Sequence, residues 1–196
     1  MKQRKIDPQD KMERVIEVAR GLFVEKGFHN VSIPDIVKVS GVSTGAIYHH
    51  FSNKETLARY IHDRTLSEFN DMLVSRLAGT STTYQKLRAF AHLVLDIAEN
   101  NPVLMQYMLF IRHDEFMTDH KPICYSEPFV WVQETVAEGI ANGDLRKGDR
   151  LISAAAFTGV LTRNIEIRLT GVLQKTLQEK SEEVITAAWN AIKADS

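Results

Sequence analysis

The segment "VSIPDIVKVSGVSTGAIYHHFSNKETL", at positions 31–57, constrains the fold more than any other part of the chain. Residues that start helices recur in it at short intervals. Ser32 is followed three residues later by Asp35, which is the pattern of a capping box, and Gly41 marks the end of that helix. Ser43 is placed to cap another short helix. The segment therefore predicts two short helices joined by a tight turn, which is a helix-turn-helix arrangement.

Helices are also predicted on both sides of this pair. Before it, Asp7 and Pro8 form an N-cap and a first helical position, and Gly27 ends a run of apolar residues at helical spacing, which are Met12, Val15, Ile16, Ala19, Leu22 and Phe23. After it, Ser52 and Glu55 form the pattern of a further capping box. The sequence thus predicts a three-helix N-terminal domain and a longer helix after it.

The helix that follows Ser43 has two different faces when its residues are placed at about 100° per residue around an axis. The inward face is predicted to contain Ala46, Ile47, His50 and Phe51. The outward face is predicted to contain Gly45, Tyr48 and His49, with Thr44 at the border. Hydrogen-bonding side chains around a glycine are typical of a surface that reads the major groove of DNA, because glycine lets the backbone come close.

Metal binding and acid–base catalysis are disfavoured for this segment. His49 and His50 are adjacent, so their side chains point about 100° apart and do not chelate one ion from one helix face. Between Asp35 and Glu55 the sequence has no carboxylate that could act with them. The hypothesis for His50 at this point is a core histidine.

Lys54 has two possible roles. It lies in the first turn of the next predicted helix, where a cation opposes the helix dipole unless an anion such as a phosphate approaches. The alternative is an ordinary solvated surface lysine.

The segment from Met12 to Leu57 resembles the DNA-binding domain of the TetR family of bacterial transcriptional regulators, above all in "SIPDIVKVSGVSTGAIYHHFSNKETL". The resemblance implies that Ser43, Thr44, Tyr48 and His49 face DNA, that Lys54 binds a phosphate, and that Ser32 caps a helix whose N-terminus approaches the DNA backbone. Many members have a lysine or arginine where this chain has Thr44, which implies a weaker attraction to phosphate here. The basic N-terminal tail is expected to supply part of that attraction.

Charge and composition agree with an ordinary globular protein. Of the 196 residues, 44% are hydrophobic and 25% charged. Residues 1–55 carry nine basic and seven acidic side chains, which leaves the remainder at −3 because the whole chain has a net charge of −1. A single cysteine and the lack of a long apolar run or of a signal-peptide pattern predict a cytoplasmic protein.

Helical spacing continues to the end of the chain, and strand alternation is not found. The pattern predicts an all-α protein of about nine helices. Together with the resemblance, it implies a helix-turn-helix DNA-binding domain at 1–55 and a helical effector-binding and dimerisation domain at 56–196. Helices are expected to start at Thr82, at Asn101 with Pro102, and at Ser126.

An effector pocket is expected in the second domain, as the resemblance implies. The apolar segment "VLMQYMLFI" combines methionines with aromatic rings, which suits an adaptable pocket but equally suits an ordinary core. The expected lining residues are Met105, Met108, Arg112, His113, Trp131 and Phe157. A metal site drawn from His113, Asp114, Glu115, His120 and Cys124 is disfavoured, because their spacing matches no standard ligand pattern.

The resemblance also implies a homodimer through the last two helices, expected at 149–169 and 181–193, with Ser181 as the cap of the last one. Ala154, Ala155, Ala156 and Gly159 in the first of these would let another helix approach closely. Packing within one subunit would produce the same pattern.

The function expected from these observations is that of a transcriptional regulator without enzymatic activity, cofactor or metal. It would be a repressor that binds a pseudopalindromic operator on double-stranded DNA as a homodimer and is released by a small-molecule effector. Two alternatives stay open at this point, which are an α-helical enzyme and a DNA-binding protein that responds to no effector.

Overall fold

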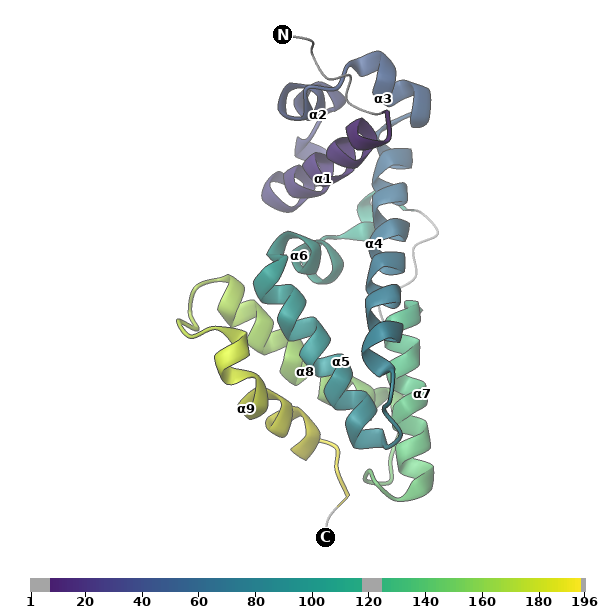
Figure 1. Cartoon of the computed structure of the whole chain (residues 1–196), viewed down its shortest axis with the longest axis vertical. Helices are drawn as coiled ribbons and strands as arrows, with labels where there is room; N and C mark the ends of the chain where they lie inside the picture. Colours follow the sequence, from purple (N-terminus) through teal and green to yellow (C-terminus); the bar gives the residue numbers. More distant parts are fainter. Residues whose placement is uncertain (1–7, 118–124, 195–196) are drawn as a thin grey trace. The chain divides into compact units, whose positions relative to one another are not determined.

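The computed structural model of the chain describes residues 8–117 and 125–194. Nine α-helices and two short 3-10 helices account for most of these residues, and they contain no β-strand beyond one isolated bridge between Leu145 and Lys193 (Figure 1). The prediction of an all-α protein with about nine helices is confirmed. No described helix is both long enough and apolar enough to cross a membrane.

The chain forms two compact units. Within the described residues, the first comprises 8–65 and 106–117, and the second comprises 66–105 and 125–194. The first unit thus includes residues 106–117, which are far from the N-terminus in sequence. The expected boundary at residue 55 had placed these residues in the second domain. The assignment of DNA binding and effector binding to separate domains stays a prediction.

Three α-helices and a 3-10 helix open the first unit, and α4 follows them. Their bounds are α1 (Pro8–Lys26), η1 (Phe28–Asn30), α2 (Ile33–Ser40), α3 (Thr44–His50) and α4 (Lys54–Leu77). Gly27 and Gly41 follow α1 and α2 with φ of 79° and 70°, values that glycine adopts without strain. The predicted helix ends are therefore confirmed, and the expected cap Asp7 lies outside the described residues.

The start of α4 differs from the prediction. Its cap is Asn53, whose Oδ1 accepts a hydrogen bond from the Thr56 backbone N–H at 2.7 Å, whereas the predicted pair was Ser52 with Glu55. The Ser52 hydroxyl instead lies 3.0 Å from the Thr56 hydroxyl. Asparagine is as strong an N-cap as serine, so the sequence offered two neighbouring caps, and the helix starts after the second.

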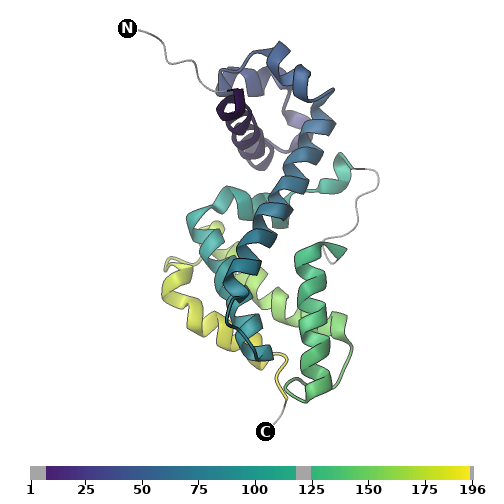
Figure 2. The same ribbon diagram turned by 45° about the vertical axis from the view of Figure 1, so that its right-hand side comes forward.

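The second unit is built mainly from four long helices, which Figure 1 labels and Figure 2 shows from another side. They are α5 (Thr83–Asn100), α7 (Glu127–Asn142), α8 (Arg150–Leu169) and α9 (Leu177–Asn190), and α6 (Pro102–Phe110) follows α5. Helix α9 packs against α5 and α8, and α7 packs against the same two helices. The predicted caps Thr82 and Ser126 lie directly before α5 and α7.

The start of α9 was predicted wrongly. The cap is Thr176, which forms a capping box with Glu179, and not Ser181. The Ser181 hydroxyl donates to the backbone oxygen of Gln178 within the helix, at 3.0 Å. Thr176 and Glu179 have the spacing of a capping box, so this start was present in the sequence.

A charged contact joins three helices of the second unit. The Glu99 carboxylate at the end of α5 accepts hydrogen bonds from Arg168 of α8, with Nη2 at 3.2 Å, and from the backbone N–H of Leu177 at 3.0 Å. The hydrogen bonds from Arg168 hold the pKa of Glu99 below its usual value, more than burial raises it. The carboxylate thus satisfies a free N–H at the start of α9 while it fixes α8 to α5.

Gly139 lies in α7 where a side chain has no room. A Cβ atom at this position of α7 would lie 2.5 Å from Cγ2 of Thr83 and 2.8 Å from Cδ1 of Leu145. Thr83 is buried and its hydroxyl donates to Asp144 at 2.8 Å, so its methyl group is held in place. A side chain at position 139 would have to displace fixed neighbours.

We therefore expect Gly139→Ala to lower the unfolding temperature, because overpacking costs about 1–3 kcal/mol and exceeds the gain in helix propensity. Gly21→Ala in α1 is the matched control, since a Cβ there has no neighbour within 4 Å. The control should be neutral or more stable by up to about 1 kcal/mol. Thermal denaturation followed by circular dichroism measures both, and equal shifts in the two variants would contradict the packing argument.

Candidate nucleic-acid interface

Helix α3 is short, and both of its ends are fixed. The Ser43 hydroxyl accepts a hydrogen bond from the Ala46 backbone N–H at 3.3 Å, as predicted for its cap. At the other end, the Phe51 backbone N–H donates to the Ile47 oxygen at 2.9 Å, and Phe51 leaves the helix in an extended conformation. A helix of seven residues has little stability of its own, so its orientation must come from packing.

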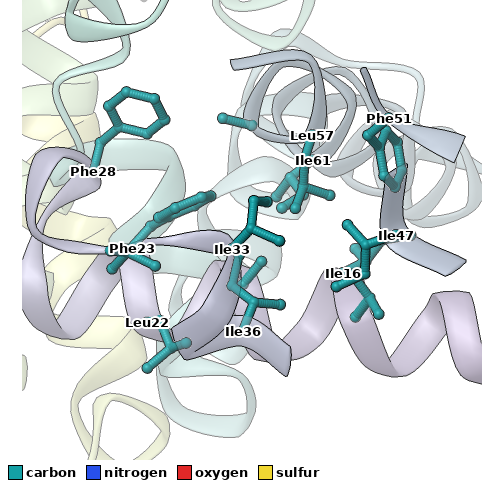
Figure 3. Close-up of a cluster of buried hydrophobic side chains, with 14 of the residues drawn as sticks. Ile16, Leu22, Phe23, Phe28, Ile33, Ile36, Ile47, Phe51, Leu57 and Ile61 are labelled. Atoms are coloured by element: carbon teal, nitrogen blue, oxygen red, sulfur yellow. The ribbon is translucent and has the colours of Figure 1, made fainter. Parts of the chain in front are cut away.

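That packing is provided by a hydrophobic core beneath α3. Ile47 is fully buried and Phe51 nearly so, together with apolar side chains from α1, α2 and α4. Figure 3 shows Ile47 near Ile16 of α1 and Phe51 beside it. Because burying one isoleucine contributes roughly 1.5–3 kcal/mol, rotating α3 about its axis would be costly.

The opposite face of α3 is exposed. Thr44, Gly45, Tyr48 and His49 all lie on it, and the Tyr48 side chain is 51% exposed. A Cβ atom at Gly45 would meet no heavy atom within 4 Å, so the backbone is open to an approaching partner there. The structure therefore places these four residues on one accessible surface, as the sequence predicted, while their contact with DNA stays a prediction.

His50 was assigned to the inward face, and this was wrong. It is exposed, with its ring centroid 5.2 Å from that of His49 and 6.4 Å from that of Phe51. His50 is the last residue of α3, and it is exposed there although it lies only about 60° from Ile47 around the helix axis. His50 therefore adds a polar group to the exposed end of α3.

Ser32 starts α2 with a complete capping box. Its hydroxyl accepts from the Asp35 backbone N–H at 3.3 Å and donates to Oδ2 of Asp35 at 2.5 Å, while its own backbone N–H donates to the same oxygen at 2.8 Å. The Ser32 hydroxyl, followed by the Ser32 backbone N–H, holds the pKa of Asp35 below its ordinary value of 3.8. The hydroxyl proton is thus committed to Asp35.

Lys54 is neither a solvated lysine nor a free cation. Its ammonium donates to the backbone oxygens of Phe28 at 2.8 Å and Val31 at 2.9 Å, and it lies 4.0 Å from the centroid of the Phe28 ring. An ammonium has three N–H donors, so one is left beyond these two bonds. Nothing in the sequence between positions 28 and 54 signalled this contact, because it joins segments that only the fold brings together.

An open groove of about 410 Å³ lies beside Ser32, Lys54 and the exposed face of α3. It is lined by His29, Asn30, Val31, Ser32, Ile33, Pro34, Tyr48 and Lys54. Three of the predicted DNA-facing residues, Ser32, Tyr48 and Lys54, therefore border one depression on the surface of the first unit.

The six residues expected to bind an effector are divided between the two units. Met105, Trp131 and Phe157 belong to the second unit, where Trp131 stacks on Phe90 with ring centroids 6.0 Å apart and Phe157 is buried. Met108, Arg112 and His113 belong to the first unit. Their role in effector binding stays a prediction.

Within the first unit, the residues just after α6 have structural partners. The Arg112 side chain is 73% exposed and lies 3.4 Å from Asp114 and 3.6 Å from Glu115. His113, in the 3-10 helix η2 (His113–Glu115), is buried against the rings of Tyr107, Phe116 and His62. His120 and Cys124 of the disfavoured metal cluster lie outside the described residues.

The sequence did not reveal that three residues of the segment 107–117 belong to the core beneath α3. Tyr107, Phe116 and Met117 are buried in that core, and the Tyr107 hydroxyl donates to the Ala58 backbone oxygen at 3.2 Å. Burial raises the pKa of Tyr107. Their apolar character signalled burial, but no local pattern indicates which core a buried residue joins.

The two helices expected to form a dimer interface differ in their free surfaces. On α8, Ala155 and Gly159 are exposed and Ile152 is 71% exposed, so an apolar surface with small residues faces outward. On α9, Val184, Ile185 and Ala188 are buried within the chain, and so is Ile192 just after its end. Dimerisation itself stays a prediction.

Comparison with known proteins gives a family match in the first unit. Residues 15–61 match the model of "Bacterial regulatory proteins, tetR family". YvdT of Bacillus subtilis (strain 168), named an uncharacterized HTH-type transcriptional regulator, is 28% identical over 143 residues, which are 70% of this chain and 71% of YvdT. The HTH-type transcriptional regulator SAUSA300_2515 of Staphylococcus aureus (strain USA300) is 28% identical over 100 residues, about half of each chain.

Solved structures share the fold over nearly the whole chain. A TetR family transcription regulator from Marinobacter aquaeolei VT8 has a TM-score of 0.79 at 19% identity, covering 94% of this chain and 96% of that one. A TetR family transcription regulator from Shewanella sp. PV-4, called putative in its published description, has a TM-score of 0.75 at 22% identity, covering 94% and 99%. At these identities, the similarity establishes the fold.

We expect Ser32→Ala to raise the pKa of Asp35, because it removes the hydrogen bond that lowers this pKa most, while the backbone N–H bond remains. Carbon-detected NMR titration of the Asp35 carboxyl measures the change. Since the folded-state pKa is depressed, the capping box stabilises the fold above the ordinary pKa of 3.8 and loses this effect as the pH falls through the folded value. A lowered or unchanged pKa in the variant would contradict the assignment.

Proposed function

The chain is a TetR-family transcriptional regulator with a helix-turn-helix unit, and we propose that it is a repressor that binds a pseudopalindromic operator as a homodimer and is released by a small-molecule effector. The observation that supports DNA binding is that α3 has one buried face and one exposed polar face. Ile47 fixes one side in the core, and the other side exposes Thr44, Gly45, Tyr48 and His49. A rigid helix with a polar free face has the form that enters a major groove.

Each exposed group has a chemical role in this proposal. The hydroxyls of Thr44 and Tyr48 and the imidazole of His49 exchange hydrogen bonds with base edges and phosphates. Gly45 lets the α3 backbone approach the DNA, since nothing occupies the space beside its Cα. At the cap, Ser43 has a backbone N–H and a hydroxyl proton that can be donated to phosphate.

Mutation of Tyr48 tests this surface. Tyr48→Ala should weaken operator binding by about tenfold or more, since a good base or phosphate contact contributes roughly 1–3 kcal/mol. Tyr125→Ala, at a 64% exposed tyrosine of the second unit, should leave affinity unchanged. Fluorescence anisotropy on duplexes selected by the native protein from a random pool gives both values. Equal affinity for Tyr48→Ala and the native protein would remove Tyr48 from the interface, and selected duplexes without a repeat would contradict the dimeric operator.

The dimer is proposed through the exposed face of α8. A two-fold axis there would pair Ile152, Ala155 and Gly159 with the same residues of a second subunit, because small residues let two helices approach closely. A pseudopalindromic operator would be read by two copies of α3, one from each subunit, in its two half-sites.

Gly159→Arg should convert the dimer to a monomer without unfolding it. A Cβ atom at Gly159 has no neighbour within 4 Å, so the isolated subunit has room for a larger side chain, whereas a close helix pair does not. Light scattering should give about twice the 22.2 kDa chain mass for the native protein and for Val74→Arg, a control at another exposed helical position. A monomeric native protein would end the dimer proposal, and a dimeric Gly159→Arg would move the interface elsewhere.

An effector would act by binding one conformation of the dimer more tightly than the other, and the ratio of these affinities limits how far it weakens DNA binding. We place its contacts among Met105, Met108, Arg112, His113, Trp131 and Phe157. Both of the earlier alternatives, an α-helical enzyme and an effector-independent DNA-binding protein, lack a specific supporting observation. A thermal-shift screen separates the second from the present proposal, because a ligand at a hundred times its Kd stabilises the fold by about 2.7 kcal/mol.

A further inference from the structure

Lys54 connects two parts of the first unit that lie on either side of the α2–α3 pair. Its ammonium, at the start of α4, donates to the Phe28 and Val31 backbone oxygens at 2.8 and 2.9 Å. Val31 directly precedes Ser32, the cap of α2, and Lys54 comes three residues after Phe51, the C-cap of α3. The two hydrogen bonds therefore tie the entry of α2 to the exit of α3.

The segment that accepts these bonds is itself held in the core. Phe28 is buried, with its ring centroid 4.7 Å from that of Phe116 and 5.5 Å from that of Phe23, and the Lys54 ammonium lies 4.0 Å from the same ring. Hydrogen bonds from an ammonium are stronger than neutral ones, and the ring adds a cation–π attraction. The bonds thus join α4 to a fixed point and not to a loose loop.

We propose that Lys54 is a positioning residue of the DNA-binding surface. It contributes to DNA affinity by fixing the α2–α3 pair between η1 and α4, and not mainly by donating to a phosphate. Two of its three N–H groups are used inside the protein, at normal hydrogen-bond lengths. This inference rests on the proposed DNA binding of the exposed α3 face.

Substitutions separate positioning from phosphate contact. Lys54→Met removes both the charge and the hydrogen bonds. Lys54→Arg keeps the charge, but its planar guanidinium does not fit the tetrahedral position between two carbonyl oxygens and the Phe28 ring. Lys38→Met is the control for charge alone, because Lys38 is an exposed lysine of the same unit. Affinity for a selected duplex is measured at several salt concentrations, at a temperature where circular dichroism shows every variant folded.

The expected result is a loss of affinity by about tenfold in both Lys54→Met and Lys54→Arg, with an unchanged slope of log K against log salt. A slope flatter by about one unit in Lys54→Met, with near-native affinity in Lys54→Arg, would show a phosphate contact and overturn the proposal. Native affinity in a fully folded Lys54→Met would overturn it too, since it would reduce the role of Lys54 to stability.

A measurement on the native protein tests the hydrogen bonds without DNA. NMR should detect scalar coupling across them, between the Lys54 ¹⁵Nζ and the carbonyl ¹³C of Phe28 and of Val31. Absence of both couplings would overturn the proposed positioning role of Lys54, even if Lys54→Met does not fold. If the couplings are present and the native protein selects no duplex, it is the proposed function that fails, so the two failures are distinguishable.

Discussion

The burial of Ile47 is the interaction on which the rest of the interface depends. Helix α3 has only seven residues and would not hold one orientation alone. With Ile47 fully buried, Tyr48 and His49, which lie about 100° and 200° from it around the helix axis, point toward solvent, whereas Ala46 is partly buried against the same core. The exposure of Tyr48 and His49 is therefore a consequence of core packing.

The core beneath α3 is shared more widely than a three-helix domain requires. Three side chains from the second half of the sequence also contribute to it, which are Tyr107, Phe116 and Met117. Phe28 packs on Phe116 within this core, and the backbone of Phe28 accepts a hydrogen bond from Lys54. A displacement of residues 107–117 would therefore disturb the η1 segment that leads into α2.

Polar side chains at the edges of this core form hydrogen bonds with backbone groups of the same unit. Ser32 and Asp35 satisfy each other and the free N–H groups at the start of α2. Lys54 donates to the Val31 carbonyl oxygen and to that of Phe28, which also accepts from the Val31 backbone N–H at 3.3 Å. Residues that the sequence suggested as DNA contacts are thus also structural, and the proposed interface is rigid because its polar groups are partly committed before DNA arrives.

The sequence by itself determined the helices, most of their caps and the exposed face of α3, because capping and helical periodicity act between residues three or four positions apart. Where two caps lay close together, as at Ser52 and Asn53, local spacing did not tell them apart, and the structure uses Asn53. The tertiary structure alone decided that His50 is exposed, that Lys54 bonds to Phe28 and Val31, and that Tyr107 joins the N-terminal core. These depend on contacts between distant segments, and local spacing shows that a side chain is buried or polar but not which partner it meets.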